Sequence, residues 1–365
     1  MAEPESGSAT ELVPILDGAA PADVSLFADL PEIRRVAADP NRSVEERIEA
    51  LEVIFDSEIG DTHFTRARNI EREFGIRMLF VKFEGGNTTG TQKDRIAFTQ
   101  SMDAVRRGFD TVTAATCGNY GVAVALAASC AGLRSVVFVP EAYKTRRIEE
   151  MTRLGAEIRR FAGDYEATVD GSREAAEREG WYDCNPGGEN TMLQMRTYGR
   201  IAEEIWEELR DAPRAVGVPV SNGTTLAGLH RGFLSLYRRG KTSRMPRLIA
   251  GSSYGKNPIV QSFLKGTEAC EDLDPHAIKE TLVNEPLINW HSTEGDEALA
   301  AVRTTGGWAS YASDRAMLKC ARLFREKEGL SVLPAATAGL IALLDRHAKE
   351  PLPGDRYVAV LTGRR

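Results

Sequence analysis

The sequence predicts an α/β fold in which parallel sheets are covered by helices on both faces. Short apolar runs rich in β-branched residues recur along the chain, and their continuous rather than alternating apolarity indicates strands buried on both faces. Longer segments with the periodicity of amphipathic helices separate these runs, as in parallel α/β sheets. With 365 residues, 42% of them hydrophobic, the chain is long enough for two domains, or for one large α/β domain with an insertion.

Each expected element follows from a local pattern of this kind. The expected strands are 77–83, 111–115, 135–139, 215–220, 247–250 and 357–361. The expected helices are 94–102, 122–128, 146–154 and 201–209. The strands at 77–83, 111–115 and 215–220 each end in a loop of small and polar residues that leads into a helix. Ligands of open α/β sheets bind at such strand ends.

Composition excludes several classes of function. A net charge of −7 without a basic run argues against nucleic acid as the main partner. No stretch is long enough to span a membrane, and the N-terminus lacks the features of a signal peptide. The five cysteines are far apart, so neither a zinc site nor a disulfide framework is indicated. We therefore expect a cytoplasmic protein that acts on metabolites without a metal, with residues 1–30 as a flexible tail.

The loop at 84–94 places Lys93 where a strand ends and a helix begins. Its sequence, Glu-Gly-Gly-Asn-Thr-Thr-Gly-Thr-Gln-Lys-Asp, is short and rich in small polar residues. Such a loop can hold an amine at the mouth of a sheet, where it could form an imine with a cofactor aldehyde. Alternatively, Lys93 is an ordinary solvated lysine at a helix start.

A second loop, Thr116-Cys117-Gly118-Asn119-Tyr120-Gly121, follows the strand at 111–115. The free amides and positive dipole end of a helix N-terminus suit a carboxylate. Alternatively, Asn119 only caps the helix. Cys117 is not accompanied by a histidine motif, so we interpret it as a small polar residue in the wall of the binding site.

Two further strand ends carry hydroxyl groups. Residues 221–228, Ser-Asn-Gly-Thr-Thr-Leu-Ala-Gly, have small residues that permit close approach of the backbone to a phosphate. Because the loop lacks the motif of a nucleoside-triphosphate site and the spacing of a dinucleotide site, a monophosphate is expected. The last strand ends in Val360-Leu361-Thr362-Gly363, where Thr362 by itself would be an unremarkable residue.

The order of these four segments resembles that of the fold-type II (β-family) pyridoxal-phosphate (PLP) enzymes, and of threonine synthases in particular. Their lysine motif reads roughly Asn-Pro-Thr-Gly-Ser-Phe-Lys-Asp-Arg, and here Thr88, Thr91 and Gln92 replace Pro, Ser and Phe. The resemblance implies that Lys93 carries PLP as a Schiff base. It further implies that PLP is contacted by Asn119 at the ring hydroxyl, by Thr362 at the ring nitrogen, and at the phosphate by Ser221, Asn222, Gly223, Thr224 and Thr225. The implied substrate-binding residues are Thr89, Thr116, Cys117, Gly118 and Asn119.

The resemblance also implies a domain organisation like that of the tryptophan synthase β subunit. Residues 31–99 and 191–365 would form a large PLP-binding domain, and residues 100–190 a smaller inserted α/β domain. The cofactor would lie in the cleft between the two domains. The protein would be a homodimer.

For the reaction, the resemblance favours a carbon–oxygen lyase of the threonine synthase type, which forms threonine and phosphate from O-phosphohomoserine and water. Arg196 and Lys144 are candidates to bind the phosphate of a phosphorylated amino-acid substrate. Two departures from threonine synthases are Leu333, where a glutamate is frequent, and Gly187-Gly188, where an arginine often follows Asn-Pro. The alternatives are β-replacement of the cysteate or cysteine synthase type with O-phosphoserine or O-acetylserine and sulfite or sulfide, a serine/threonine dehydratase, and a non-catalytic PLP or amino-acid binding protein.

Overall fold

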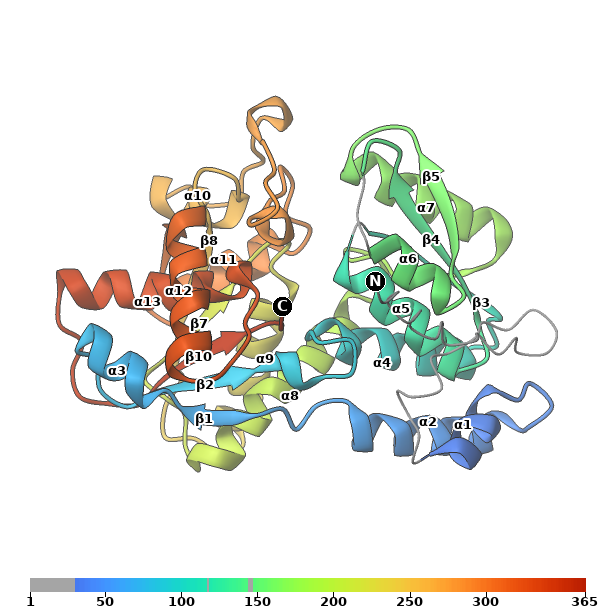
Figure 1. Cartoon of the computed structure of the whole chain (residues 1–365), viewed down its shortest axis with the longest axis horizontal. Coiled ribbons are helices and arrows are strands. Elements are labelled where there is room, and N and C mark those ends of the chain that lie inside the picture. The colour runs from blue at the N-terminus through green and yellow to red at the C-terminus, as the bar shows by residue number, and fades with distance from the viewer. Residues whose placement is uncertain (1–29, 117, 144–146) are drawn as a thin grey trace, which may run out of the picture. The chain divides into compact units, whose positions relative to one another are not determined.

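The computed structural model describes residues 30–116, 118–143 and 147–365, and these form two compact units. The smaller unit contains the described residues up to Ile54 together with Ser101–Tyr182, and the larger contains Phe55–Gln100 and Asp183–Arg365. Figure 1 labels the elements of each unit. The expected flexible tail lies almost wholly outside the described residues.

The described part of the larger unit is built on a six-stranded sheet with the order β1-β2-β10-β7-β8-β9. Its strands are β1 (Phe64–Arg66), β2 (Leu79–Phe83), β10 (Tyr357–Leu361), β7 (Ala215–Pro219), β8 (Arg247–Ser253) and β9 (Trp308–Ala312). Neighbouring strands from β2 to β9 are parallel, and only the edge strand β1 is antiparallel to its neighbour. Every residue of β7 and β10 is buried, as the continuous apolar runs predicted.

Helices of the larger unit approach the sheet and each other closely. They are α3 (Arg68–Phe74), α4 (Lys93–Arg106), α8 (Thr191–Leu209), α9 (Thr224–Arg238), α10 (Pro258–Lys265), α11 (Gly295–Thr304), α12 (Asp314–Lys327) and α13 (Ala338–Lys349), of which α4 continues into the smaller unit. A Cβ at Gly232 of α9 would lie 2.4 Å from the carbonyl oxygen of Gly199 in α8, so this crossing requires glycine.

The described part of the smaller unit has a four-stranded sheet with the order β5-β4-β3-β6. Its strands are β3 (Thr111–Ala115), β4 (Arg134–Pro140), β5 (Glu157–Phe161) and β6 (Tyr182–Asp183, whose second residue belongs to the larger unit), and β4 is parallel to both β3 and β5. The helices are α1 (Pro31–Ala38), α2 (Val44–Glu58, which continues into the larger unit), α5 (Asn119–Cys130), α6 (Arg147–Arg153) and α7 (Tyr165–Glu179). Apart from Asn119, every residue of α5 is buried, because the helix is apolar all round.

The predicted α/β class with parallel sheets and flanking helices is confirmed by these two sheets. The unit boundaries differ from the expected domain ranges, since residues 30–54 group with residues 101–182. One physical reason is the contact of this segment with the end of α5. Arg47 donates a hydrogen bond to the carbonyl oxygen of Ala131 at 2.7 Å. No helix in the described ranges combines the length and the apolarity that crossing a membrane requires.

Candidate active site

The larger unit brings three of the four predicted loops to one edge of its sheet. The strands β2, β10 and β7 are neighbours and parallel, so their carboxyl ends meet at the same edge. The lysine loop follows β2, Thr362 follows β10, and residues 221–225 follow β7. This is the edge at which open α/β sheets bind ligands.

Lys93 is the first residue of α4 and is half-buried. Its backbone N–H donates to the hydroxyl of Thr91 at 3.3 Å. Burial lowers the pKa of the Lys93 ammonium to about 8, against the opposing effect of the negative charge of Glu294. An appreciable fraction of this amine is therefore unprotonated near neutral pH, as a nucleophilic amine requires.

The C-terminal segment holds the lysine loop in place. The N–H of Gln92 donates to the carbonyl oxygen of Thr362 at 3.1 Å, and the N–H of Arg364 donates to that of Gly90 at 2.9 Å. The guanidinium of Arg364 also donates to the carbonyl oxygens of Gly85, at 3.1 Å, and Thr88, at 3.0 Å. Thr362 and Lys93 are thus fixed by one set of backbone contacts, although they lie far apart in the sequence.

Thr89, a predicted substrate contact, is engaged with Asp94. Its N–H donates to the Asp94 carboxylate at 2.7 Å, and its hydroxyl donates to the other carboxylate oxygen. Burial raises the pKa of Asp94 to about 7. The hydroxyl proton of Thr89 is therefore committed within the loop, which leaves its oxygen as an acceptor.

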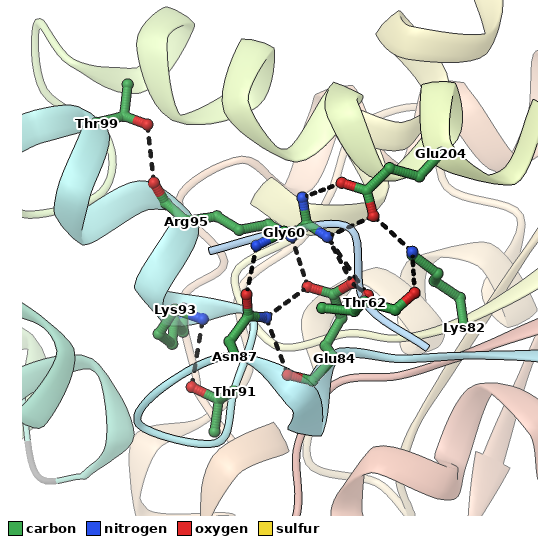
Figure 2. A network of polar contacts seen from close by, with 10 residues as sticks. All are labelled: Gly60, Thr62, Lys82, Glu84, Asn87, Thr91, Lys93, Arg95, Thr99 and Glu204. Carbon is green, nitrogen blue, oxygen red and sulfur yellow. Dashed lines mark hydrogen bonds and ion pairs between the residues drawn. The ribbon is translucent and has the colours of Figure 1, made fainter. Parts of the chain in front are cut away.

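Figure 2 shows a buried network of charged residues that joins the start of the lysine loop to β2, α4 and α8. The guanidinium of Arg95 binds Glu84 at 2.6 and 3.0 Å and Glu204 at 2.6 and 2.8 Å. The ammonium of Lys82 lies 2.5 Å from Glu204 and donates to the carbonyl oxygen of Thr62 at 2.5 Å. Two buried cations are thus balanced by two carboxylates, and Arg95 uses the bidentate geometry that guanidinium groups favour.

The network fixes the chain on both sides of Lys93. Glu84 is the first residue after β2 and Arg95 is the third residue of α4, and both side chains are fully buried. The side-chain amide of Asn87, within the loop, donates to the carbonyl oxygen of Glu84 at 2.9 Å and to its carboxylate at 3.0 Å. Sequence reasoning missed this network. The pair of opposite charges at the two ends of the lysine motif was the available signal.

The predicted phosphate loop, residues 221–225, leads from β7 into α9. Gly223 precedes the helix at a φ of 97°, and a Cβ there would lie 2.6 Å from the carbonyl oxygen of Glu294. Hydroxyl groups and the first-turn amides of a 15-residue helix suit a phosphate group. The residues of the loop therefore fit the phosphate of PLP.

Three residues that the sequence analysis did not identify support this loop. The side-chain amide of Asn257 and the hydroxyl of Ser292 each donate to the carbonyl oxygen of Ser221 at 3.0 Å. The side-chain amide of Asn289 donates to that of Asn222 at 3.0 Å. These contacts are long-range in sequence, and no local pattern indicated them.

A fourth missed residue, Glu294, is buried against the same loop. The hydroxyl of Thr224 donates to its carboxylate at 2.5 Å, and the N–H of Gly187 donates to the other oxygen at 2.8 Å. The hydroxyl of Thr191 is a longer donor, at 3.4 Å. Burial raises the pKa of Glu294, against these hydrogen bonds and the charge of Lys93.

The remaining predicted residues lie elsewhere. In the smaller unit, Asn119 begins α5 directly after the loop that follows β3, and Thr116 accepts a hydrogen bond from the N–H of Gly118 at 3.2 Å. Cys117 and Lys144 lie outside the described residues. Arg196 is exposed on α8 of the larger unit.

The family model described as "Pyridoxal-phosphate dependent enzyme" matches residues 55–363, which include all four loops. The chain belongs to this family. Its cofactor is pyridoxal 5'-phosphate, which confirms the resemblance seen in the sequence.

Curated members of the family that resemble this PLP enzyme include threonine synthases. That of Methanocaldococcus jannaschii is 28% identical over 309 residues, covering 83% of this chain and 74% of the relative. That of Synechocystis sp. is 28% identical over 310 residues, covering 83% and 76%. The enzyme is thus similar to threonine synthases along most of its length.

Solved structures of PLP enzymes share its fold. Maize serine racemase superimposes with a TM-score of 0.71 at 20% identity, covering 87% of this chain and 93% of the racemase. The processed form of threonine deaminase isoform 2 from Solanum lycopersicum gives a TM-score of 0.71 at 16% identity, covering 97% of this chain and 96% of the deaminase. The predicted fold-type II class is confirmed.

Proposed function

We propose that this PLP enzyme is a carbon–oxygen lyase of the threonine synthase type, which converts O-phosphohomoserine and water into threonine and phosphate. The observation that carries the proposal is the position of Lys93, half-buried at the start of α4 beside the loops of two neighbouring strands. Its pKa of about 8 suits an amine that must both bind an aldehyde and exchange protons. The threonine synthases among its relatives support the choice of reaction.

Apart from Arg196 and Lys144, each predicted residue has a role in this proposal. Bound PLP supplies an electron sink for the substrate carbons. Lys93 would hold the cofactor aldehyde and would move protons at the substrate Cα and Cβ. Thr116 to Asn119, at the N-terminus of α5, bind the substrate carboxylate, with Thr89 as a further contact. The Thr362 hydroxyl would bind the ring nitrogen, Asn119 would bind the ring hydroxyl, and residues 221–225 would bind the phosphate.

The role of Lys93 is tested by Lys93→Ala. We expect the purified wild-type protein to show the visible absorbance of a lysine-bound PLP, and the variant to lose it because the amine that forms the imine is removed. The measurement is an absorbance spectrum after PLP loading and dialysis. Lys265→Ala, which removes an exposed lysine of α10, is the matched control and should retain the spectrum. An unchanged spectrum in Lys93→Ala would exclude this assignment.

A second candidate, β-replacement on a substrate such as O-acetylserine, is favoured by one observation. After Asn185-Pro186, where threonine synthases often carry an arginine, the N–H of Gly187 donates to the carboxylate of Glu294. The reactions are distinguished by a panel of substrates. The panel contains O-phosphohomoserine, threonine, and either O-phosphoserine or O-acetylserine together with sulfite or sulfide. Threonine formed from O-phosphohomoserine supports the first proposal, whereas cysteate, cysteine or ketobutyrate as the sole product overturns it.

A further inference from the structure

A carboxylate is buried against the loop proposed to bind the cofactor phosphate. Only 1% of Glu294 is exposed, and its carboxylate accepts hydrogen bonds from the hydroxyl of Thr224 and the N–H of Gly187. Its backbone N–H donates to the carbonyl oxygen of Asn222 at 3.0 Å. Glu294 therefore contacts the loop 221–225 through both its side chain and its backbone.

This arrangement places two negative groups in competition for the same donor. The hydroxyl of Thr224 has one proton and can donate to only one acceptor at a time. While Thr224 donates to Glu294, it cannot donate to a phosphate. A carboxylate and a phosphate at one loop, largely shielded from water, also repel each other more strongly than they would in solvent. Protonation of Glu294 removes both conflicts.

We propose that Glu294 governs binding of the cofactor phosphate, and that the phosphate enters the loop 221–225 together with one proton shared with Glu294. This inference rests on the proposed function for the position of the phosphate. A neutral Glu294 carboxyl donates its O–H to a phosphate oxygen, and the Thr224 hydroxyl is released to donate to another. Glu294 is thus a cofactor-binding residue in addition to those predicted from the sequence.

The charged groups around Glu294 determine the pH at which its carboxylate takes up a proton. Lys93 at the start of α4 favours the ionised carboxylate, and Glu297 on α11 opposes it. The segments at Gly187, Thr191 and Thr224 contribute neutral donors. In the segments flanking Glu294, Asp296 is engaged with the N–H of Cys270, and His291 is paired with Asp272 at 2.9 Å.

The sign of the pH dependence follows from these contacts. Burial raises the pKa of Glu294, so the protonated form persists to higher pH than in a solvated glutamate. Because this form binds the phosphate, affinity for the phosphate group is greatest at low pH and is lost as the pH rises through that pKa. Glu294→Gln keeps a hydrogen-bond donor at the site but cannot ionise.

The test compares PLP with pyridoxal, which lacks the phosphate, in cofactor-free protein. Dissociation constants for both are measured by absorbance or fluorescence titration at a series of pH values. The ratio of the two affinities cancels the contributions of Lys93 and the pyridine ring. In wild-type protein we expect this ratio to fall with rising pH relative to Glu294→Gln. At the alkaline end of the series, we expect the ratio of PLP affinity to pyridoxal affinity to be at least about tenfold higher in Glu294→Gln than in wild type. One pH unit of linked ionisation corresponds to a factor of ~10.

Two further measurements keep the inference open to failure if Glu294→Gln folds poorly. Calorimetry in buffers of different ionisation enthalpy should show more proton uptake when wild-type protein binds PLP than when it binds pyridoxal. Glu297→Gln changes an exposed residue of α11 and removes a negative neighbour of Glu294. In this variant the ratio of PLP affinity to pyridoxal affinity should still fall with rising pH, but the fall should occur at lower pH than in wild type.

The possible results separate this inference from the proposed function. Parallel pH profiles of the ratio in wild type and Glu294→Gln, or equal proton uptake with PLP and pyridoxal, would overturn the role of Glu294. A ratio near one at every pH would instead show that the protein has no phosphate cradle. That result would remove the proposed role of residues 221–225 as well. A ratio that is high at low pH and diverges from that of Glu294→Gln as the pH rises supports both.

Discussion

Lys93 and Glu294 act on each other's ionisation at the scale of single residues. Burial lowers the pKa of Lys93 to about 8, and the negative charge of Glu294 keeps it from falling further. Lys93 was identified from sequence because a lone lysine in a Gly/Thr loop between strand and helix is a local pattern. Glu294 was not, because Thr293-Glu294-Gly295 is an ordinary sequence for a helix start, and its contacts with Gly187 and Thr224 come from distant segments.

We expect Glu294→Gln to lower the pKa of Lys93 below about 8, because the variant loses the charge that stabilises the ammonium. The measurement is the rate of chemical acylation of Lys93 against pH in cofactor-free protein, followed by mass spectrometry of the labelled peptide. Labelling of the exposed Lys265 in the same sample corrects for reagent decay. If the midpoint of the acylation rate against pH is unchanged or higher in the variant, the electrostatic coupling of Lys93 to Glu294 is contradicted.

At the scale of secondary-structure elements, the lysine loop is positioned by residues outside it. Arg95 of α4 binds Glu84 after β2 and Glu204 of α8, and Glu204 also binds Lys82 within β2. The sequence analysis found β2 and α4 because their apolar patterns are local. The pairing of Lys82 with Glu204 could not be predicted in the same way, because it depends on how α8 packs against the sheet. The polar strand β5, Glu157–Phe161, was missed because its residues lack a continuous apolar run.

We expect Glu204→Gln to destabilise the protein by about 3–5 kcal/mol, because Arg95 and Lys82 are then left with one buried carboxylate between them. The measurement is the free energy of unfolding in denaturant, with PLP bound and removed. Glu208→Gln, on an exposed position of the same helix, is the control and should change stability by less than ~0.5 kcal/mol. Equal stability of the two variants would show that the network contributes little.

The same network predicts a component of acid unfolding. Although burial acts in the opposite direction, hydrogen bonds from Arg95 lower the pKa of Glu204 to about 2. A carboxyl whose pKa is depressed in the folded state stabilises that state above its unfolded pKa of about 4.3, and this contribution disappears as the pH falls toward the folded value. Stability measured between these pH values should therefore fall less steeply in Glu204→Gln than in wild type. Identical slopes would contradict the assignment.

At the scale of the whole molecule, the chain is divided between two units in a way that local patterns did not reveal. The expected domain ranges placed residues 31–99 together, whereas in the structure the segment up to Ile54 groups with residues 101–182. The sequence contains no linker or change of composition at residue 54 that would mark this division. The determinant is a tertiary contact, in which α1 and α2 pack on the unit that contains α5, and Gly132 approaches Ala38 closely.

We expect Gly132→Ala to destabilise the smaller unit by more than the strain of a left-handed alanine alone. Gly132 has a φ of 63°, and a Cβ there would lie 2.1 Å from the carbonyl oxygen of Ala38, so α1 must move. Gly108→Ala is the matched control because Gly108 has a φ of 78° in the same unit but no atom within 4 Å of the added Cβ. Both variants carry the strain of a left-handed residue, and Gly132→Ala adds an overlap that costs about 1–3 kcal/mol.

The readout is hydrogen exchange of the two variants, combined with unfolding in denaturant. Relative to Gly108→Ala, the Gly132→Ala variant should lose protection in α1, α2 and the end of α5, while the strands β7 and β10 of the larger unit keep theirs. This pattern follows because the three atoms nearest to the added methyl group all belong to Ala38. If protection falls instead in β7 and β10, or if the two variants unfold at the same denaturant concentration, residues 30–54 are not an integral part of the smaller unit.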